Sequence, residues 1–202
     1  MNLKKVLSGI VSLVMVSTNV ASIGVFAEGT PIELIKNGTF DNALKGWGSY
    51  VDASSGADAN VSVKDGKLDI AIQDVGTLNY GVQAYYNIVP LYKNGQYHLS
   101  FDISSDTSRL VECILQENGG SYTAYSWKSI DLVADETQHI EIDFTMEYDS
   151  DLFSKLVFNC GEQKGDGDNS PHNIYLDNVS LTLVDDSQVD YSEFKKDENY
   201  IH

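Results

Sequence analysis

The sequence predicts an all-β protein, a β-sandwich of the jelly-roll type, and three observations support this fold class. Apolar and polar residues alternate with period two along most of the chain, which is typical of half-buried strands. Turn sequences such as Asp65-Gly66, Asn94-Gly95 and Asn118-Gly119-Gly120 separate these stretches. No stretch has a sustained helical period. Many short strands joined by turns indicate a sandwich or a barrel.

The alternation predicts the strands in order along the chain. We place them at residues 33–36, 47–52, 60–64, 67–74, 80–89, 95–104, 109–117, 122–131, 137–148, 153–160 and 173–184. Five aromatic side chains fit the buried face of their segments, and we expect them in the core: Phe40, Trp47, Phe101, Phe144 and Phe158.

The two ends of the chain differ from this β region. Residues 1–27 are typical of a secretory signal peptide, because Lys4 and Lys5 precede an apolar run at 6–16 and a cleavage site ends at Ala27. A single membrane anchor is the alternative, but the run is short, and no later segment is long and apolar enough to span a bilayer. Residues 28–184 then form one domain. Residues 185–202 lose the alternation and are expected to be a linker or disordered tail. We therefore expect a secreted, extracellular protein.

The chain is strongly acidic, with 13 Lys and Arg against 30 Asp and Glu and a formal net charge of −17. Removal of residues 1–27 takes away two lysines and no acid, which leaves 11 against 30 and a charge of −19. Such a surface repels nucleic acid and anionic lipid, so neither is an expected partner. It suits a neutral ligand, a cation, or solubility outside the cell.

Cys113 and Cys160 are the two cysteines of the chain. An even pair in an exported protein invites a disulfide. Alternation points both side chains into the core, where buried free thiols are equally compatible with the pattern. The sequence leaves the two states open.

Established catalytic motifs are missing from the sequence. It has no Gly-x-Ser-x-Gly elbow, no His-Glu-x-x-His, no phosphate loop and no Cys-x-x-Cys. The four histidines have no ligand spacing, and we expect them to be structural: His98, His139, His172 and His202. The many acidic residues are compatible with a glycosidase carboxylate pair, but nothing singles out an acid and a nucleophile.

Tyrosines and amides concentrate on particular strand faces. Alternation gives three groups that each share one face of a strand: Gln83, Tyr85 and Asn87; Glu112, Ile114 and Gln116; Val157 and Asn159. A face with rings and amides but few cations suits a sugar polymer, because pyranose rings stack on aromatic side chains and hydroxyls pair with amides. The alternative is that these tyrosines are ordinary strand formers with solvated hydroxyls.

A series of short motifs runs in order from about Ile32 to Val184: Asn37-Gly38-Thr39-Phe40-Asp41, Gly46-Trp47, Asp65-Gly66-Lys67-Leu68, Tyr80-Gly81-Val82, Gly95-Gln96-Tyr97-His98-Leu99-Ser100-Phe101, Gln116-Glu117-Asn118-Gly119, Leu156-Val157-Phe158-Asn159-Cys160-Gly161 and Leu176-Asp177-Asn178-Val179-Ser180-Leu181. Together these motifs resemble secreted carbohydrate-binding modules of the family 4 type, which are related to families 9, 16 and 22.

The resemblance implies a sandwich with a ligand cleft across one sheet that binds single β-glucan chains, such as amorphous cellulose or mixed-linkage glucan, without catalysis. It also implies a possible catalytic domain in the same polypeptide, since such modules usually accompany secreted glycoside hydrolases. Three alternatives stay open. The first is the N-terminal part of a secreted glucanase or xylanase, the second is a cell-surface adhesion sandwich that binds protein, and the third is a catalytic jelly roll.

The resemblance and the alternation together predict the ligand-binding residues. Family cleft positions match Tyr50, Tyr80, Tyr85, Asn87, Gln116, Tyr122 and Asn159, with Tyr50 and Tyr122 as flanking rings. Alternation adds Gln83. Glu112 stands at a position that is basic in some relatives, Asn159 shortens a glutamine, and Trp127 adds aromatic bulk.

The same resemblance implies a structural Ca²⁺ that ties the first strand to the last. Its matching positions are Thr39, Gly66 and Asp177. We add Asp41, because a nearby carboxylate is a natural further ligand and calcium takes oxygen ligands from distant parts of a chain.

Overall fold

The computed structural model describes residues 31–164 and 171–193. The predicted signal peptide and the last part of the predicted tail therefore lie outside the described residues. In the described part, no helix is long and apolar enough to cross a membrane.

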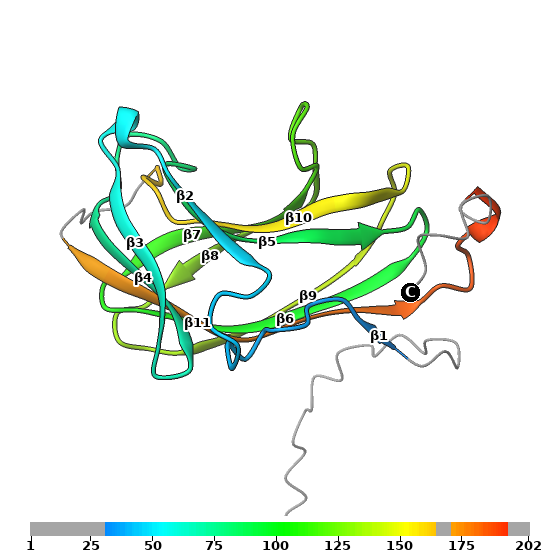
Figure 1. Cartoon of the computed structure of the whole chain (residues 1–202), viewed down its shortest axis with the longest axis horizontal. Helices are drawn as coiled ribbons and strands as arrows, with labels where there is room; N and C mark the ends of the chain where they lie inside the picture. Colours follow the sequence, from blue (N-terminus) through cyan, green and yellow to red (C-terminus); the bar gives the residue numbers. More distant parts are fainter. Residues whose placement is uncertain (1–30, 165–170, 194–202) are drawn as a thin grey trace, which may run out of the picture.

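The chain folds into two antiparallel sheets that face each other, as predicted (Figure 1). We call them the front sheet and the back sheet. The front sheet has the order β2 (Trp47–Val51), β5 (Val82–Leu91), β10 (Asp151–Asn159), β7 (Arg109–Gln116) and β8 (Ala124–Leu132). The back sheet has the order β3 (Asp58–Lys64), β4 (Lys67–Asp74), β11 (His172–Asp185), β6 (Gln96–Ser105) and β9 (Gln138–Thr145), and β1 (Ile32–Glu33) pairs with β11.

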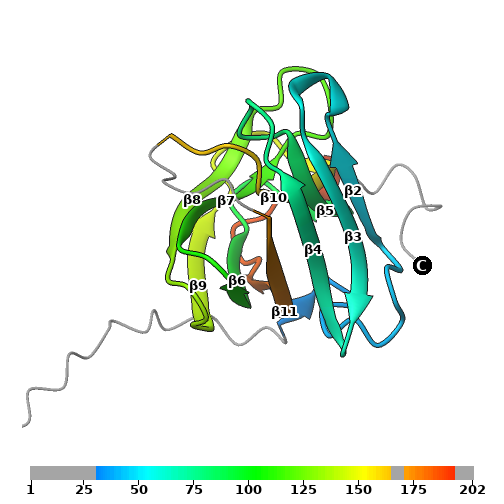
Figure 2. The ribbon, with the colours of Figure 1, turned by 90° about the vertical axis from the view of Figure 1, so that its left-hand side faces the viewer.

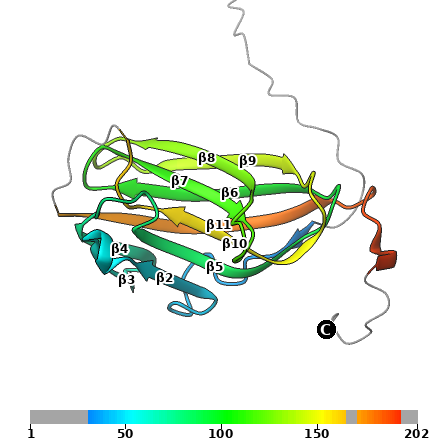
Figure 3. The same ribbon diagram turned by 90° about the horizontal axis from the view of Figure 1, so that it is seen from above.

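The views along and above the sandwich show how the layers are placed. Figure 2 shows the two curved sheets side by side, and Figure 3 shows that the strands of both sheets lie along about the same axis. Two short 3₁₀ turns complete the fold, η1 (Ala53–Ser55) after β2 and η2 (Tyr191–Glu193) near the end of the described chain. Of the predicted tail, η2 contacts the sandwich through Tyr191, whose ring centroid lies 5.2 Å from that of Tyr92.

Each predicted strand is present, and the ends that differ have local causes. The first strand stops at Glu33, because its carboxylate accepts the backbone N–H of Ile35 at 2.7 Å and bends the chain out of the ladder. Strand β8 begins at Ala124 rather than at Tyr122, which has a φ of 54°. This left-handed backbone interrupts the extended conformation just before β8 begins.

The core lies between the two sheets and is built on aromatic contacts. Phe158 of β10 is fully buried, with its ring centroid 5.0 Å from that of Phe101 and 6.3 Å from that of Trp47. Phe40 is buried beside Trp47, with ring centroids 5.1 Å apart. Phe144 is only partly buried and packs against Tyr97. The predicted core aromatics therefore all contact the core.

Both cysteines are buried free thiols. Cys113 pairs in register with Phe158, and Cys160 follows two residues later on the same side of β10. Desolvation raises the pKa of both thiols, to about 12 for Cys160, so they behave as small apolar core residues.

Candidate functional site

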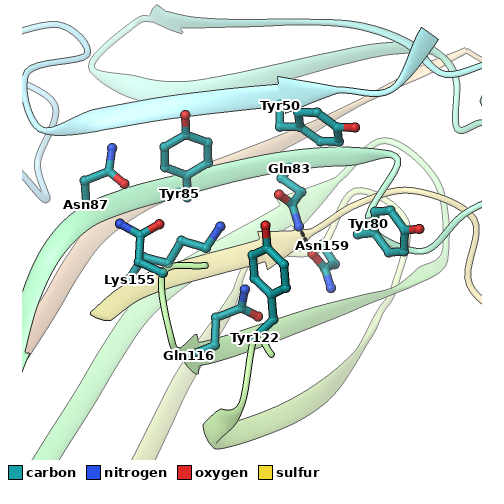
Figure 4. Close-up of a pocket in the computed structure, with 10 residues that line it drawn as sticks. Tyr50, Tyr80, Gln83, Tyr85, Asn87, Gln116, Tyr122, Lys155 and Asn159 are labelled. Atoms are coloured by element: carbon teal, nitrogen blue, oxygen red, sulfur yellow. Dashed lines mark hydrogen bonds between the residues drawn. The ribbon is translucent and has the colours of Figure 1, made fainter. Parts of the chain in front are cut away.

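The outer face of the front sheet carries a cleft of about 630 Å³ (Figure 4). Strand β2 bounds one side of the cleft, and the loop between β7 and β8 rises above the sheet on the other (Figure 1). The lining side chains are phenols, amides and one lysine: Tyr50, Tyr80, Gln83, Tyr85, Asn87, Gln116, Asn118, Tyr122, Lys155 and Asn159.

The central row across the sheet is apolar. In register, Gly48 of β2 lies beside Tyr85, Tyr85 beside Val157, and Val157 beside Ile114. Gly48 leaves room for the phenol, since a Cβ there would lie only 2.6 Å from the Tyr85 ring. Val157 and Ile114 are buried and form an apolar floor, while Trp127 continues the row on the edge strand and is 56% exposed.

A polar row runs parallel to it. The Gln83 amide donates to Asn159 Oδ1 at 2.8 Å, and the Asn159 amide donates to Glu112 Oε2 at 3.0 Å. Asn79 donates to the same Glu112 oxygen at 2.9 Å, and Trp127 Nε1 donates to the other at 3.2 Å. The Glu112 carboxylate therefore orients the amides of this row and accepts hydrogen bonds from three neutral donors.

The third row brings Asn87, Lys155 and Gln116 side by side on three adjacent strands. The Lys155 ammonium extends between the two cleft walls (Figure 4), 5.4 Å from the ring centroid of Tyr85 and 5.4 Å from that of Tyr122. Partial burial lowers the pKa of Lys155 by desolvation. This row supplies hydrogen-bond donors and one positive charge.

The loop between β7 and β8 holds Tyr122 over the cleft in a rare backbone conformation. Tyr122 has a φ of 54°, and its N–H donates to the Gly119 carbonyl at 2.9 Å. The Glu117 carboxylate accepts the N–H and hydroxyl of Ser121 at 3.0 and 2.9 Å, which pins the loop. Left-handed backbone at a non-glycine residue persists where surroundings fix it, and it is concentrated at ligand sites. Tyr122 is 58% exposed.

The structure brings most of the predicted ligand-binding residues together. Eight of the ten line the cleft: Tyr50, Tyr80, Gln83, Tyr85, Asn87, Gln116, Tyr122 and Asn159. Glu112 and Trp127 lie on the same sheet face beside the lining and support it through hydrogen bonds. Whether these side chains contact a ligand stays a prediction.

Sequence reasoning missed Lys155 and Asn118. The alternation that groups Val157 with Asn159 also places Lys155 on this face, so the sequence pattern could have predicted its position. Asn118 lies in the β7–β8 loop, where alternation carries no information.

The predicted calcium residues come from three segments that approach one another. The Val179 N–H donates to the Gly38 carbonyl at 3.0 Å, which places the segment of Thr39 beside β11. Leu176 pairs with Leu68, two residues after Gly66, and Asp177 lines one small depression with Lys67. Thr39 donates to Asp41 at 2.7 Å. Within residues 31–164 and 171–193 no group of three or more Asp, Glu, His or Cys could hold a metal, so such a site would depend on hydroxyl and carbonyl oxygens.

The described histidines lie outside the cleft. His98 pairs with Asp143 and His139 with Asp102, each at 2.7 Å on the outer face of the back sheet. His172 is buried and contacts the guanidinium of Arg109, which also donates to the Cys160 and Gly161 carbonyls at 2.9 and 2.8 Å. Arg109 thus points away from the cleft. His202 lies outside the described residues.

Comparison with known proteins agrees with the fold. Residues 33–169 match the CBM_4_9 family model, described as "Carbohydrate binding domain". A solved structure described as "CBM4 structure and function" is 28% identical, with a TM-score of 0.65 over 73% of this chain and 98% of that one. The N-terminal cellulose-binding domain of β-1,4-glucanase C from Cellulomonas fimi is 24% identical, with a TM-score of 0.57 over 73% of this chain and 94% of that one, which supports the fold.

A curated enzyme also contains a similar segment. Cellulose 1,4-beta-cellobiosidase of Acetivibrio thermocellus is 28% identical over 158 residues, which is 74% of this chain. The chain spans only 17% of the length of that enzyme. The family-model match covers more than half of the sequence, and the chain therefore belongs to the CBM_4_9 family of carbohydrate-binding domains.

Proposed function

We propose that the front-sheet cleft binds single β-glucan chains, such as amorphous cellulose or mixed-linkage glucan, without catalysing a reaction on them. The observation that carries the proposal is the layered chemistry of one sheet face. An apolar floor of Val157 and Ile114 lies between a row of amides and a row of donors, and the phenol rings of Tyr50 and Tyr122 stand at its sides.

This arrangement matches the two surfaces of a pyranose ring. Its axial C–H groups are apolar and stack on the face of a phenol, while its equatorial hydroxyls both donate and accept hydrogen bonds. Amides present one donor and one acceptor group each, so Gln83, Gln116 and Asn159 can pair with hydroxyls of either polarity. One or two ring stackings of about 1–3 kcal/mol each, reduced by the cost of ordering the chain, give an expected Kd of roughly 10 µM to 1 mM.

Affinity electrophoresis tests the proposal on a panel of barley β-glucan, hydroxyethylcellulose, laminarin and xylan. We expect retardation on at least one β-1,4-linked or mixed-linkage glucan. Tyr122→Ala should weaken this retardation about tenfold, since it removes an exposed stacking ring, and should leave the melting temperature unchanged.

Tyr148→Ala is the matched control, because Tyr148 is 49% exposed and lies outside the cleft lining. It should bind like the wild type. Absence of retardation on the whole panel contradicts the proposal, and equal loss in both variants removes Tyr122 from the site.

We also propose that the module is secreted and works beside a glycoside hydrolase. The similarity to part of a cellobiosidase supports an enzyme partner, and the pattern of residues 1–27 supports export. Sequencing of the native reading frame beyond His202 tests the first point. Recovery of the protein from culture medium with Glu28 as its first residue tests the second.

A structural Ca²⁺ held by Thr39, Asp41, Gly66 and Asp177 is part of the proposal. Their hydroxyl, carboxylate and carbonyl oxygens are the donors this ion prefers, and the pairing of β11 with β4 and with residue 38 brings their segments together. A bound ion stabilises the folded state by mass action. We expect EDTA to lower Tm by several degrees and added Ca²⁺ to restore it, with little change in glycan binding. An unchanged Tm would reject the calcium site.

A further inference from the structure

Lys155 is the one ionised side chain among the described residues that line the cleft. The other lining side chains are phenols and amides, which are uncharged near neutral pH. The two rings beside its ammonium stabilise a cation through their π faces, but they do not use its three strong donors.

No acidic residue of the described chain balances this charge. Lys155 forms no ion pair or hydrogen bond with any part of residues 31–164 and 171–193. The carboxylate on the same face, Glu112, lies two rows away and is already committed to Asn79, Asn159 and Trp127. The carboxylate beside the cleft is therefore satisfied, whereas the ammonium within the cleft is partly buried and unpaired among the described residues.

We propose that Lys155 selects glycans that carry a carboxylate, such as a uronosyl unit, on the sugar that lies between Tyr85 and Tyr122. The inference rests on the proposed function, since it assumes that the cleft holds a glycan. An ammonium donates charge-assisted hydrogen bonds to a hydroxyl and to a carboxylate alike, but only the carboxylate adds the attraction between opposite charges, which is stronger in a partly buried site than in bulk water. Asn87 and Gln116 flank Lys155 in register and can hold the hydroxyls of the same sugar.

The acidic surface does not prevent this contact. The net charge of −17 repels an anionic polymer at long range, but salt screens exposed charges beyond about 8–10 Å at physiological ionic strength. A carboxylate within the cleft would lie at contact distance from Lys155 and between two low-dielectric ring faces, where screening is weaker.

Isothermal titration calorimetry with paired ligands tests the inference. The pairs are the β-1,4-linked, mixed-linkage and β-1,3-linked glucan backbones, as soluble oligosaccharides, and the same oligosaccharides with part of their C6 primary alcohols oxidised to carboxylates. We expect wild-type protein to bind the carboxylated form at least about fivefold more tightly. This ratio should fall to about one in Lys155→Met, which keeps the length of the side chain, and should be largely retained in Lys155→Arg.

Lys64→Met is the control, because it removes the same charge at the end of exposed β3 on the back sheet. Its ratio should equal that of the wild type. A wild-type ratio near one, or a Lys155→Met ratio equal to that of the wild type, overturns the role of Lys155 and leaves glycan binding intact. Absence of binding by either form of every ligand contradicts both proposals.

Discussion

Tyr85 and Tyr86 are adjacent in β5, and they separate the two faces of the front sheet. Tyr86 points into the sandwich, where it is buried with its ring 5.4 Å from that of Trp47 and its hydroxyl accepting the Lys36 N–H. Tyr85 points outward into the cleft beside Lys155. Of these two tyrosines, Tyr86 thus stabilises the fold, whereas Tyr85 remains available to a ligand.

The inner and outer faces of the front sheet are specified by different interactions. The inner face is fixed by apolar burial and ring packing, which are largely independent of chemical detail. The outer face is fixed by a few directional contacts, such as those from Gln83 to Asn159 and from Asn159 to Glu112. Substitutions on the inner face should therefore change the free energy of unfolding, and substitutions on the outer face should change binding.

The largest expected effect on the free energy of unfolding is in β10, where two phenylalanines differ in burial. Phe158→Ala should lower the free energy of unfolding by about 3–5 kcal/mol, because Phe158 is fully buried between the rings of Trp47 and Phe101. Phe153→Ala should change it by less than about 0.5 kcal/mol, because Phe153 is 57% exposed. Chemical denaturation measures both values. Similar costs for the two variants would show that burial does not distinguish the positions.

An intermediate effect on stability is expected at Gly46, which directly precedes β2, and is compared with Gly48 within β2. A Cβ on Gly46 would lie 2.6 Å from the ring of buried Tyr86, at a φ of +86°, so Gly46→Ala should destabilise the fold by about 1–3 kcal/mol. A Cβ on Gly48 would lie 2.6 Å from the ring of Tyr85, which can move toward the cleft. Gly48→Ala should keep its Tm and bind glycan several-fold more weakly. Equal loss of stability in both variants would contradict the separation of the faces.

The smallest effect is expected on the outer face of the back sheet, which carries ion pairs. The hydrogen bond to Asp102 raises the pKa of His139 above its ordinary value of 6.5. The stabilising contribution of His139 is therefore present below about pH 6.5 and is lost as pH rises through its raised pKa. Hydrogen bonds from Asn178 and His139 lower the pKa of Asp102 below 3.8, so its contribution is lost in stronger acid.

Titration of the His139 ring signals by NMR measures this shift. Asp102→Asn should lower the pKa of His139 toward 6.5, and added glycan should leave it unchanged because the pair lies on the opposite sheet. A wild-type pKa at or below 6.5 would show that the pair does not form.

Sequence patterns predicted the faces better than they predicted the interactions on them. Period-two alternation placed Tyr85 outward and Phe158 inward because each strand has one buried face, and the paired register confirms both positions. The conformation of Tyr122 was not predictable, because a positive φ at a non-glycine residue arises from the surrounding loop. The three donors to Glu112 come from strands and loops that are distant in sequence, so its role as an anchor appears only in the folded chain.

Mapping of backbone amide shifts by NMR, during titration with the best-retained soluble oligosaccharide, tests whether glycan binds the outer face of the front sheet. We expect perturbations concentrated at the cleft rows, including Gln83, Tyr85, Lys155 and Gln116, with Tyr86 and the back sheet little affected. Perturbations centred on the outer face of the back sheet, around His98 and His139, would contradict it.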